Sequence, residues 1–207
     1  MKYGKLNLGQ VEAVVNKLGG MEGVQRFLRD EITISKPTRS WREKDGVIHF
    51  SVTSDGTTGG EWIKRLEGKD FHLSDCSKQL LRSSDFKPTD SITTEVAVLK
   101  GAFFKDKDRI TKKIRAEADN RGFIKLNAEV ACLVREKFTD KEIKTMGFDW
   151  LITMHKPIKD SVSVLGLLGT GWDGGESCLG AYYGGPGSLW GRGSGFVFLV
   201  AQVSFED

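Results

Sequence analysis

The sequence predicts an α+β fold, and three observations support this prediction. Short runs rich in β-branched and aromatic residues recur along the chain and are typical of strands. Segments with apolar residues at helical spacing lie between those runs. The 207 residues are 39% hydrophobic and 29% charged, which is the composition of a globular chain able to bury a core.

Residues 1–90 are expected to form a small helix-rich α+β region without an assignable role. Apolar residues recur at helical spacing from Leu8 to Leu18, and a Gly-Gly pair then ends that helix. The polar residues 83–91 are interpreted as a linker to a second region, 91–207. The expected elements are helices over 8–18 and 21–28, a strand over 46–53, a helix around Trp62, and a helix over 74–82 capped by Ser74.

Residues 91–207 are expected to begin with a strand, two helices and a second strand. The run 93–99 (TTEVAVL) is β-branched, and Ile110, Ile114 and Ala118 share one face of a helix over 106–121. Asn127 can cap the next helix, which carries an apolar stripe. The stripe consists of Val130, Leu133, Val134 and Phe138, and the strands that follow are expected over 148–155, 161–168, 177–183 and 195–203.

Residues 166–195 hold twelve of the 25 glycines, with bulky apolar residues spaced among them. A flexible linker lacks large apolar residues, and a packed core lacks so many glycines. The segment is therefore expected to be a loop-rich surface held by a few anchors, and such surfaces commonly bind ligands. From residue 160 onward the only basic residue is Arg192, against five acidic ones, so this end is not expected to follow a phosphate backbone.

Residues 93–203 resemble the C-type-lectin fold as used by variable proteins of diversity-generating retroelements. In that fold a strand, two helices and a second strand precede a long loop region, and the last strand pairs back near the first. The apolar residues of the glycine-rich segment match the family layout. The resemblance implies that the scaffold anchors are Trp172, Leu179, Trp190 and Phe196.

The resemblance also implies which positions vary. Retroelement mutagenesis randomises adenines, typically in asparagine codons, which can yield Gly, Ser, Tyr, Asp and Arg but never Lys, Glu, Gln, Met or Trp. Turns select Gly, Ser and Asp in any case. The candidate variable, ligand-binding positions are Asp173, Gly174, Ser177, Gly180, Tyr182, Tyr183, Gly184, Gly185, Ser188, Gly191, Arg192 and Ser194.

The expected function is non-enzymatic binding of a protein or other macromolecular ligand. Tyr supplies contact area at low entropic cost, and Ser, Gly and Asp adapt their hydrogen bonds, as in antibody loops. Tyr182 and Tyr183 are neighbours on an expected strand and should point to opposite faces, so one of them is expected to contact the ligand. Trp172 and Trp190 are expected to pack inward.

Two other functions remain open and are disfavoured. Formylglycine-generating enzymes resemble the same fold and use a cysteine pair, but only Cys178 lies in the loop-rich end, with Cys132 on an expected helix. Nucleic-acid binding would use the basic part of the first region, where acidic residues interleave with the basic ones. The basic residues concerned are Arg26, Arg29, Lys36, Arg39 and Arg42.

No cofactor or metal is expected. Calcium-dependent sugar binding is disfavoured, since no Glu-Pro-Asn or Gln-Pro-Asp motif is present and carboxylates are sparse near the loops. The three cysteines lie far apart and form neither a metal-ligand spacing nor a disulfide framework, which fits a reducing compartment. The start of the chain lacks a signal-peptide core, and no apolar run is long enough to span a membrane, so a cytoplasmic location is expected.

Overall fold

The computed structural model describes residues 7–33 and 39–201. The chain divides into two compact units, residues 1–39 and residues 40–207, here called the N-terminal and C-terminal units. Each unit is described by itself. The expected α+β class is confirmed, since helices cover a large mixed sheet in the C-terminal unit.

The N-terminal unit contains two short helices, α1 (Leu8–Lys17) and α2 (Gly20–Leu28), close to the predicted ranges. The side chains of Asn7 and Gln10 form a capping box at the start of α1. Gly19, at φ +90°, adopts the left-handed conformation between the helices. Among the described residues of this unit only Gly23 is buried, and large apolar side chains stay exposed on both helices.

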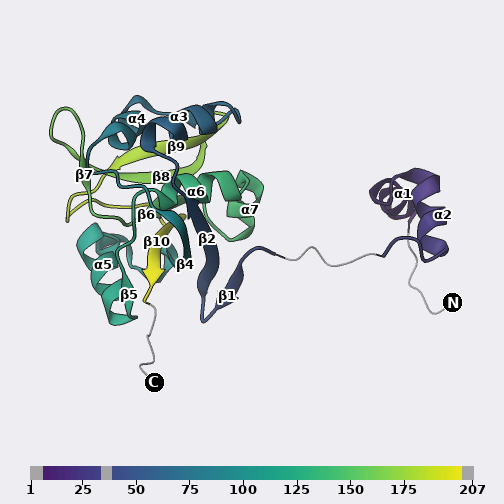
Figure 1. The fold of residues 1–207 in the computed structure, drawn as a ribbon. Helices are drawn as coiled ribbons and strands as arrows, with labels where there is room; N and C mark the ends of the chain where they lie inside the picture. The colour runs from purple at the N-terminus through teal and green to yellow at the C-terminus, as the bar shows by residue number, and fades with distance from the viewer. Residues whose placement is uncertain (1–6, 34–38, 202–207) are drawn as a thin grey trace, which may run out of the picture. The chain divides into compact units, whose positions relative to one another are not determined.

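The C-terminal unit is built on one open, mixed sheet (Figure 1). Most neighbouring strands are antiparallel, whereas β10 and β6 pair in parallel, as do β3 and β9. The main path of the sheet, in spatial order, is β1 (Arg42–Lys44), β2 (Val47–Asp55), β4 (Asp90–Lys100), β10 (Ser194–Val200), β6 (Trp150–Thr153), β8 (Leu165–Asp173), β9 (Glu176–Tyr183) and β3 (His72–Leu73). Two short strands complete it, β5 (Phe123–Ile124) beside β10 and β7 (Ile158–Lys159) beside β8.

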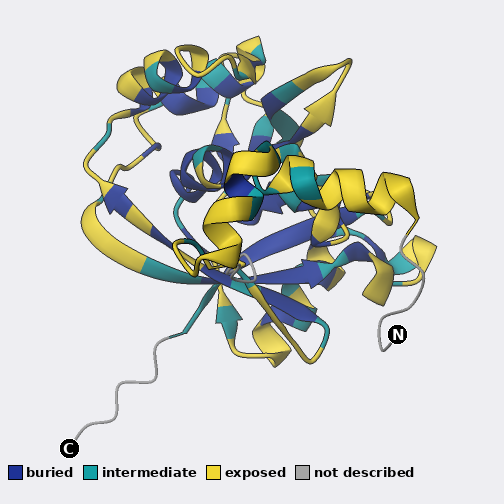
Figure 2. Cartoon of the chain, turned by 90° about the vertical axis from the view of Figure 1, so that its right-hand side faces the viewer, coloured by how far each residue is buried: buried dark blue, intermediate teal, exposed yellow. Residues whose placement is uncertain are grey.

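Two apolar cores lie on the two faces of this sheet, and β10 serves both. Phe196 and Phe198 pack on the α5 side with Ile114, whereas Val197 packs on the opposite side with Trp62. Buried residues accordingly concentrate in the central strands and on the inner faces of the helices (Figure 2). The helices of this unit are α3 (Gly59–Glu67), α4 (Asp75–Arg82), α5 (Thr111–Asn120), α6 (Val130–Lys137) and α7 (Asp140–Thr145), with two 3-10 turns, η1 (Gly101–Phe103) and η2 (Asp106–Asp108).

The observed boundary between units lies at residue 39/40 and not at the expected 90/91. Strand β2 pairs with β4 across the expected boundary, so both belong to one sheet. The expected linker is tied into the same unit, because the Thr89 backbone N–H donates to Oε2 of Glu129 at 2.6 Å and its carbonyl accepts from Gly56 N–H at 2.9 Å. Long-range strand pairing therefore overrides the polar composition of residues 83–91.

Two helices begin later than expected. Residues 106–108 form a 3-10 turn, and α5 starts only at Thr111, after the buried Arg109. Glu129, and not Asn127, occupies the N-cap position of α6. The Asn127 side chain still lies beside the helix start, where its Oδ1 accepts from the Glu129 backbone N–H at 3.4 Å, while its amide group donates to the Lys87 carbonyl.

The strand expected over 161–168 is shifted along the chain to Leu165–Asp173. The Asp160 side chain accepts from the backbone N–H groups of Val162 and Val164, at 2.9 and 2.8 Å, and so holds residues 160–164 as a turn. The glycines that follow are part of a paired strand and not of a loop. The strand expected over 195–203 is β10, Ser194–Val200, and its last expected residues, 202 and 203, lie outside the described range.

Candidate ligand-binding site

The first part of the glycine-rich segment is a β-hairpin made of β8 and β9. Asp173 pairs with Glu176, and the two residues between them, Gly174 and Gly175, both have positive φ angles, +56° and +97°. A two-residue turn of this kind matches the twist of the flanking strands and favours glycine at both positions. The glycines at the hairpin tip are therefore explained by the turn itself.

Inside the hairpin, glycines of β8 leave room for aromatic rings from the neighbouring strands. A Cβ built at Gly169 would stand 2.9 Å from Cε2 of Tyr182, and one at Gly171 would stand 2.7 Å from ring carbons of Trp150. Both distances are shorter than any relaxed carbon–carbon contact. The rings of Trp150 and Tyr182 thus lie directly over a bare stretch of β8.

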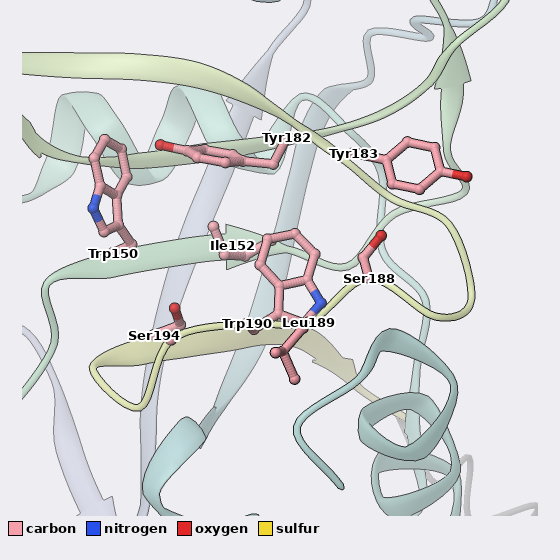
Figure 3. A pocket seen from close by; sticks show the side chains of 9 residues that line it. Trp150, Ile152, Tyr182, Tyr183, Ser188, Leu189, Trp190 and Ser194 are labelled. Atoms are coloured by element: carbon pink, nitrogen blue, oxygen red, sulfur yellow. The ribbon is translucent and has the colours of Figure 1, made fainter. Parts of the chain in front are cut away.

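These rings form part of an open pocket of about 440 Å³, here called the aromatic pocket (Figure 3). The Trp150 and Tyr182 ring centroids lie 5.3 Å apart at 70°, and those of Tyr182 and Trp190 lie 6.2 Å apart at 60°, both edge-to-face arrangements. None of the lining residues is charged at neutral pH. They are Trp150, Ile152, Tyr182, Tyr183, Ser188, Leu189, Trp190, Gly191 and Ser194.

The loop that carries Trp190 is bound to the start of α5. The indole Nε1–H of Trp190 donates to Oγ1 of Thr111 at 2.9 Å, and its backbone N–H donates to the Arg109 carbonyl at 3.0 Å. The backbone N–H groups of Thr111 and Lys112 donate to the carbonyls of Ser188 and Pro186, at 3.1 and 2.9 Å. The loop has no regular secondary structure of its own, and these bonds hold it in place.

Buried Arg109 strengthens the same attachment. Its Nε donates to the Gly101 carbonyl at 2.9 Å, and its Nη2 donates to the Phe104 carbonyl at 3.0 Å. The same guanidinium forms an ion pair with Asp106 at 2.8 Å and donates to the Trp190 carbonyl at 3.4 Å. One side wall of the aromatic pocket is therefore rigidly connected to the rest of the unit.

The aromatic pocket brings together five of the twelve predicted variable positions, which come from β9, the following loop and the start of β10. They are Tyr182, Tyr183, Ser188, Gly191 and Ser194. Tyr182 and Tyr183 both line the pocket, and their side chains point away from each other, as expected for neighbours on a strand (Figure 3). That one of them contacts a ligand stays a prediction. Tyr182 packs inward against Trp150, whereas Tyr183 is 63% exposed.

The other seven predicted positions lie elsewhere. Asp173 and Gly174 are exposed at the hairpin tip, and Arg192 is exposed beyond the aromatic pocket. The hydroxyl of Ser177 donates to the Asp140 carboxylate, so its side chain has a structural partner. The three remaining positions are glycines of β9 and the following loop, namely Gly180, Gly184 and Gly185.

Three of the four expected anchors are buried, and one is not. Leu179 and Phe196 have no exposed surface, and Trp190 is 8% exposed. Trp172 is 53% exposed, so the expectation that it packs inward was wrong. It lies beside the exposed hairpin turn, where residues 173–176 are exposed as well and no core surrounds it.

The glycines of this segment differ in whether a side chain could replace them. A Cβ at Gly191 would meet only Oγ of Ser194 at 3.6 Å, which is ordinary contact. A Cβ at Gly184 would stand 2.7 Å from Cγ of the buried Leu167. At Gly185 the obstacle is the exposed Tyr183 ring, 2.6 Å away, which is free to rotate. Among the candidate variable glycines, the space around Gly191 therefore admits a side chain more readily than the space around Gly184.

Sequence reasoning missed three residues of the aromatic pocket: Trp150, Ile152 and Leu189. Trp150 and Ile152 lie in a strand that was expected, but β6 reaches the glycine-rich segment through its pairing with β8 on one side and with β10 on the other. Both pairings are long-range and leave no local signal. The one available clue was Leu189, which is exposed and lies between the expected binding positions Ser188 and Gly191.

Burial keeps one tyrosine and two cysteines of the C-terminal unit in their neutral forms. Burial raises the pKa of Tyr182, so its hydroxyl stays protonated at neutral pH. Burial also raises the pKa of Cys178, to about 11, and raises that of Cys132. All three cysteines are free thiols, and the two buried ones lack the lowered pKa of a reactive cysteine.

The basic residues proposed for nucleic-acid binding are largely paired with carboxylates. Arg26 and Arg29 each contact Glu31, at 3.7 and 3.8 Å, and Arg42 contacts Glu95 at 2.5 Å. Lys36 lies outside the described residues. A carboxylate therefore lies beside each of these three arginines and interrupts a uniform basic surface.

Within residues 7–33 and 39–201, no cluster of three or more His, Cys, Asp or Glu side chains is arranged to hold a metal ion. No helix in the same residues has the length and apolar character needed to cross a bilayer. Comparisons with models of known protein families, with curated protein sequences and with solved structures find no match to this chain. The fold is therefore assigned as α+β with a mixed open sheet, and no lectin fold is identified.

Proposed function

We propose that this chain is a ligand-binding protein whose aromatic pocket is diversified, as in the variable proteins of diversity-generating retroelements. The observation that supports it is the convergence of five candidate variable positions on one pocket. Three residues that are expected to stay constant line the same pocket. Trp150 and Ile152 lie outside the variable segment, and Trp190 is of a type that adenine mutagenesis cannot produce. The pocket therefore combines a constant wall with replaceable positions.

A C-type-lectin-like fold for residues 91–207 is part of this proposal. The order of β4, α5, α6 and β6 ahead of the hairpin follows the order implied by the resemblance, with the short elements β5 and α7 inserted between them. The last strand, β10, pairs antiparallel with β4, with Val197 opposite Val98, which is the return pairing implied by the resemblance. In this fold the loops after β6 would be the natural place for a ligand.

The chemistry of the aromatic pocket suits binding better than catalysis. Its lining contains no carboxylate, imidazole or thiol, the groups that most often act as bases and nucleophiles. Exposed aromatic residues such as Tyr183 give large contact areas for few frozen rotations and are enriched in protein interfaces. The proposed ligand is a macromolecule, and a protein is the first class to test.

Sequencing of the encoding locus tests the diversification. We expect an imperfect repeat of the DNA that encodes residues 170–198, with mismatches confined to adenines of the repeat, and a reverse-transcriptase gene nearby. Relatives from one clone should differ at codons 182, 183, 188, 191 and 194 and agree at codons 150 and 190. Changes spread evenly over the gene would contradict the proposal.

A display experiment tests binding independently of genetics. One library randomises the five variable positions of the aromatic pocket. A matched library randomises five exposed residues of α3, α4 and the turn after α3, namely Lys64, Glu67, Lys69, Asp75 and Arg82. Selection against a panel of folded proteins should enrich binders from the first library and far fewer from the second. Equal enrichment from both would remove the special role of the pocket.

A further inference from the structure

A second pocket, of about 360 Å³, lies against the outer face of α5 and is here called the α5 pocket. It has the size of a small-molecule site. Its walls are mostly apolar, formed by Ala116, Pro157, Leu165 and Pro186. The polar residues around it are Thr111, Lys112, Arg115 and Asp119, and Gly184 completes the lining.

Two cations line this pocket, and neither forms an ion pair within the part of the chain that the structure describes. Arg115 is half-buried, and its Nη1 and Nη2 atoms donate to the carbonyls of Met154 and His155 at 2.9 and 2.8 Å. These bonds use two of the five N–H groups of the guanidinium. Lys112 is exposed, and its backbone is fixed by the bond to the Pro186 carbonyl.

The charge balance of the α5 pocket favours an anion. One carboxylate, Asp119, stands against the two cations, and it lies too far from Arg115 to form an ion pair. Burial lowers the pKa of Arg115, and the carboxylate of Asp119 partly offsets this shift. His155 adds no charge, because burial lowers its pKa to about 4.

A guanidinium held in place by carbonyl bonds is well suited to bind a carboxylate. Its position is set before the ligand arrives, so little side-chain entropy is lost on binding. The hydrogen bond would join two charged partners, which makes it stronger than a neutral one. The apolar walls would at the same time remove an apolar ligand body from water.

We propose that the α5 pocket is a binding site for a small organic acid, a carboxylate attached to a compact apolar body. Arg115 and Lys112 contact the carboxylate, and Pro157, Leu165 and Pro186 contact the apolar body. The site goes beyond the proposed function of the aromatic pocket, since only Gly184 of its lining belongs to the candidate variable positions. Its ligand would be the same in every diversified copy.

Phenylacetate and its uncharged analogue phenylacetamide distinguish this site from a merely apolar pocket. In ¹⁵N–¹H spectra of the full chain, phenylacetate should shift the signals of residues 112–119, 184, 185 and 187. The dissociation constant should be on the order of 1–10 mM for so small a ligand. Phenylacetamide should bind about tenfold more weakly, because it lacks the charge. Added salt should weaken the binding of phenylacetate and leave the binding of phenylacetamide unchanged.

Two lysines on α5 supply a matched pair of variants. Lys112→Gln removes a cation that lines the pocket and should weaken the binding of phenylacetate about threefold. Lys113→Gln is the control, because Lys113 is outside the lining and pairs with Asp108 at 2.5 Å. It should bind as the parent does. Arg115→Gln should abolish the response, provided that its spectrum remains that of a folded chain.

Three outcomes would overturn the proposal. The first is no shift at residues 112–119 at about 50 mM phenylacetate, well above the expected dissociation constant. The second is equal affinity for the acid and the amide, which would mean an apolar pocket without anion recognition. The third is equal weakening by the Lys112 and Lys113 variants. None of these results bears on the aromatic pocket, so the proposed function would stand or fall separately.

Discussion

The ring of Tyr182 lies directly on the backbone of Gly169. A Cβ at residue 169 would stand 2.9 Å from Cε2 of that ring and 2.8 Å from Cδ1 of Ile152. Gly169 lies in β8, between β6 and β9, so the contact links all three strands. The depth of the aromatic pocket thus depends on a residue without a side chain.

Gly169→Ala should destabilise the protein by about 1–3 kcal/mol, because the added methyl group overpacks a buried position. The matched control is Gly60→Ala in α3, where a Cβ meets nothing within 4 Å. That change should leave the free energy of unfolding unchanged or raise it by up to about 1 kcal/mol, through the better helix propensity of alanine. Urea denaturation measures both. Equal stability of the two variants would contradict the role given to Gly169.

Trp190→Ala should lower the free energy of unfolding by about 3–5 kcal/mol, since a large buried side chain is removed together with its bond to Thr111. Trp172→Ala should cost less than about 1 kcal/mol, because Trp172 is half exposed at the hairpin. Thermal and urea unfolding of the two variants, side by side, tests the assignment of the anchors. A larger loss for the Trp172 variant would reverse it.

Gly184→Ser and Gly191→Ser test which variable positions the fold accepts. The first places a Cβ 2.7 Å from Cγ of Leu167 and should cost about 1–3 kcal/mol. The second places a Cβ in ordinary contact with Oγ of Ser194, at 3.6 Å, and should change the free energy of unfolding by less than about 0.5 kcal/mol. In natural relatives, residue 184 should then vary less than residue 191. A freely varying residue 184 would show that Leu167 can move aside.

His155 should make the protein less stable in mild acid. Burial lowers its pKa to about 4 from 6.5, and its Nε2 accepts a bond from the Leu168 backbone N–H at 3.0 Å. Because the unfolded chain binds a proton at higher pH than the folded one, the stabilisation is complete above pH 6.5. It is lost as the pH falls from 6.5 towards 4, by about 3 kcal/mol in total.

His155→Gln should be less stable than the parent at pH 7.5 but should lack most of this pH dependence. The slope between pH 6 and 5 should drop by about 1.4 kcal/mol per pH unit, the value for one proton. Gly60→Ala serves as the control, since it removes no titratable group, and should keep the parent slope. The same slope in the His155 variant would show that another group titrates.

Most helices and strands could be predicted because their signals are local. The apolar spacing of α1 and the β-branched run of β4 lie within about ten residues of sequence. Strand β8 was only partly found, because Gly166, Gly169 and Gly171 carry no strand propensity. Those glycines are in a strand only because β6 and β9 pair with it on either side.

By itself, the sequence determined the α+β class, the order of the main elements and the segment that carries the candidate site. Residue types and their spacing are sufficient for these, since they depend on local propensity and on which residues avoid water. Only the tertiary structure decided that Trp190 is buried while Trp172 is exposed, and that Trp150 joins Tyr182 in one pocket. Burial and strand pairing depend on contacts between residues that are distant along the chain, and a local sequence pattern does not encode those contacts.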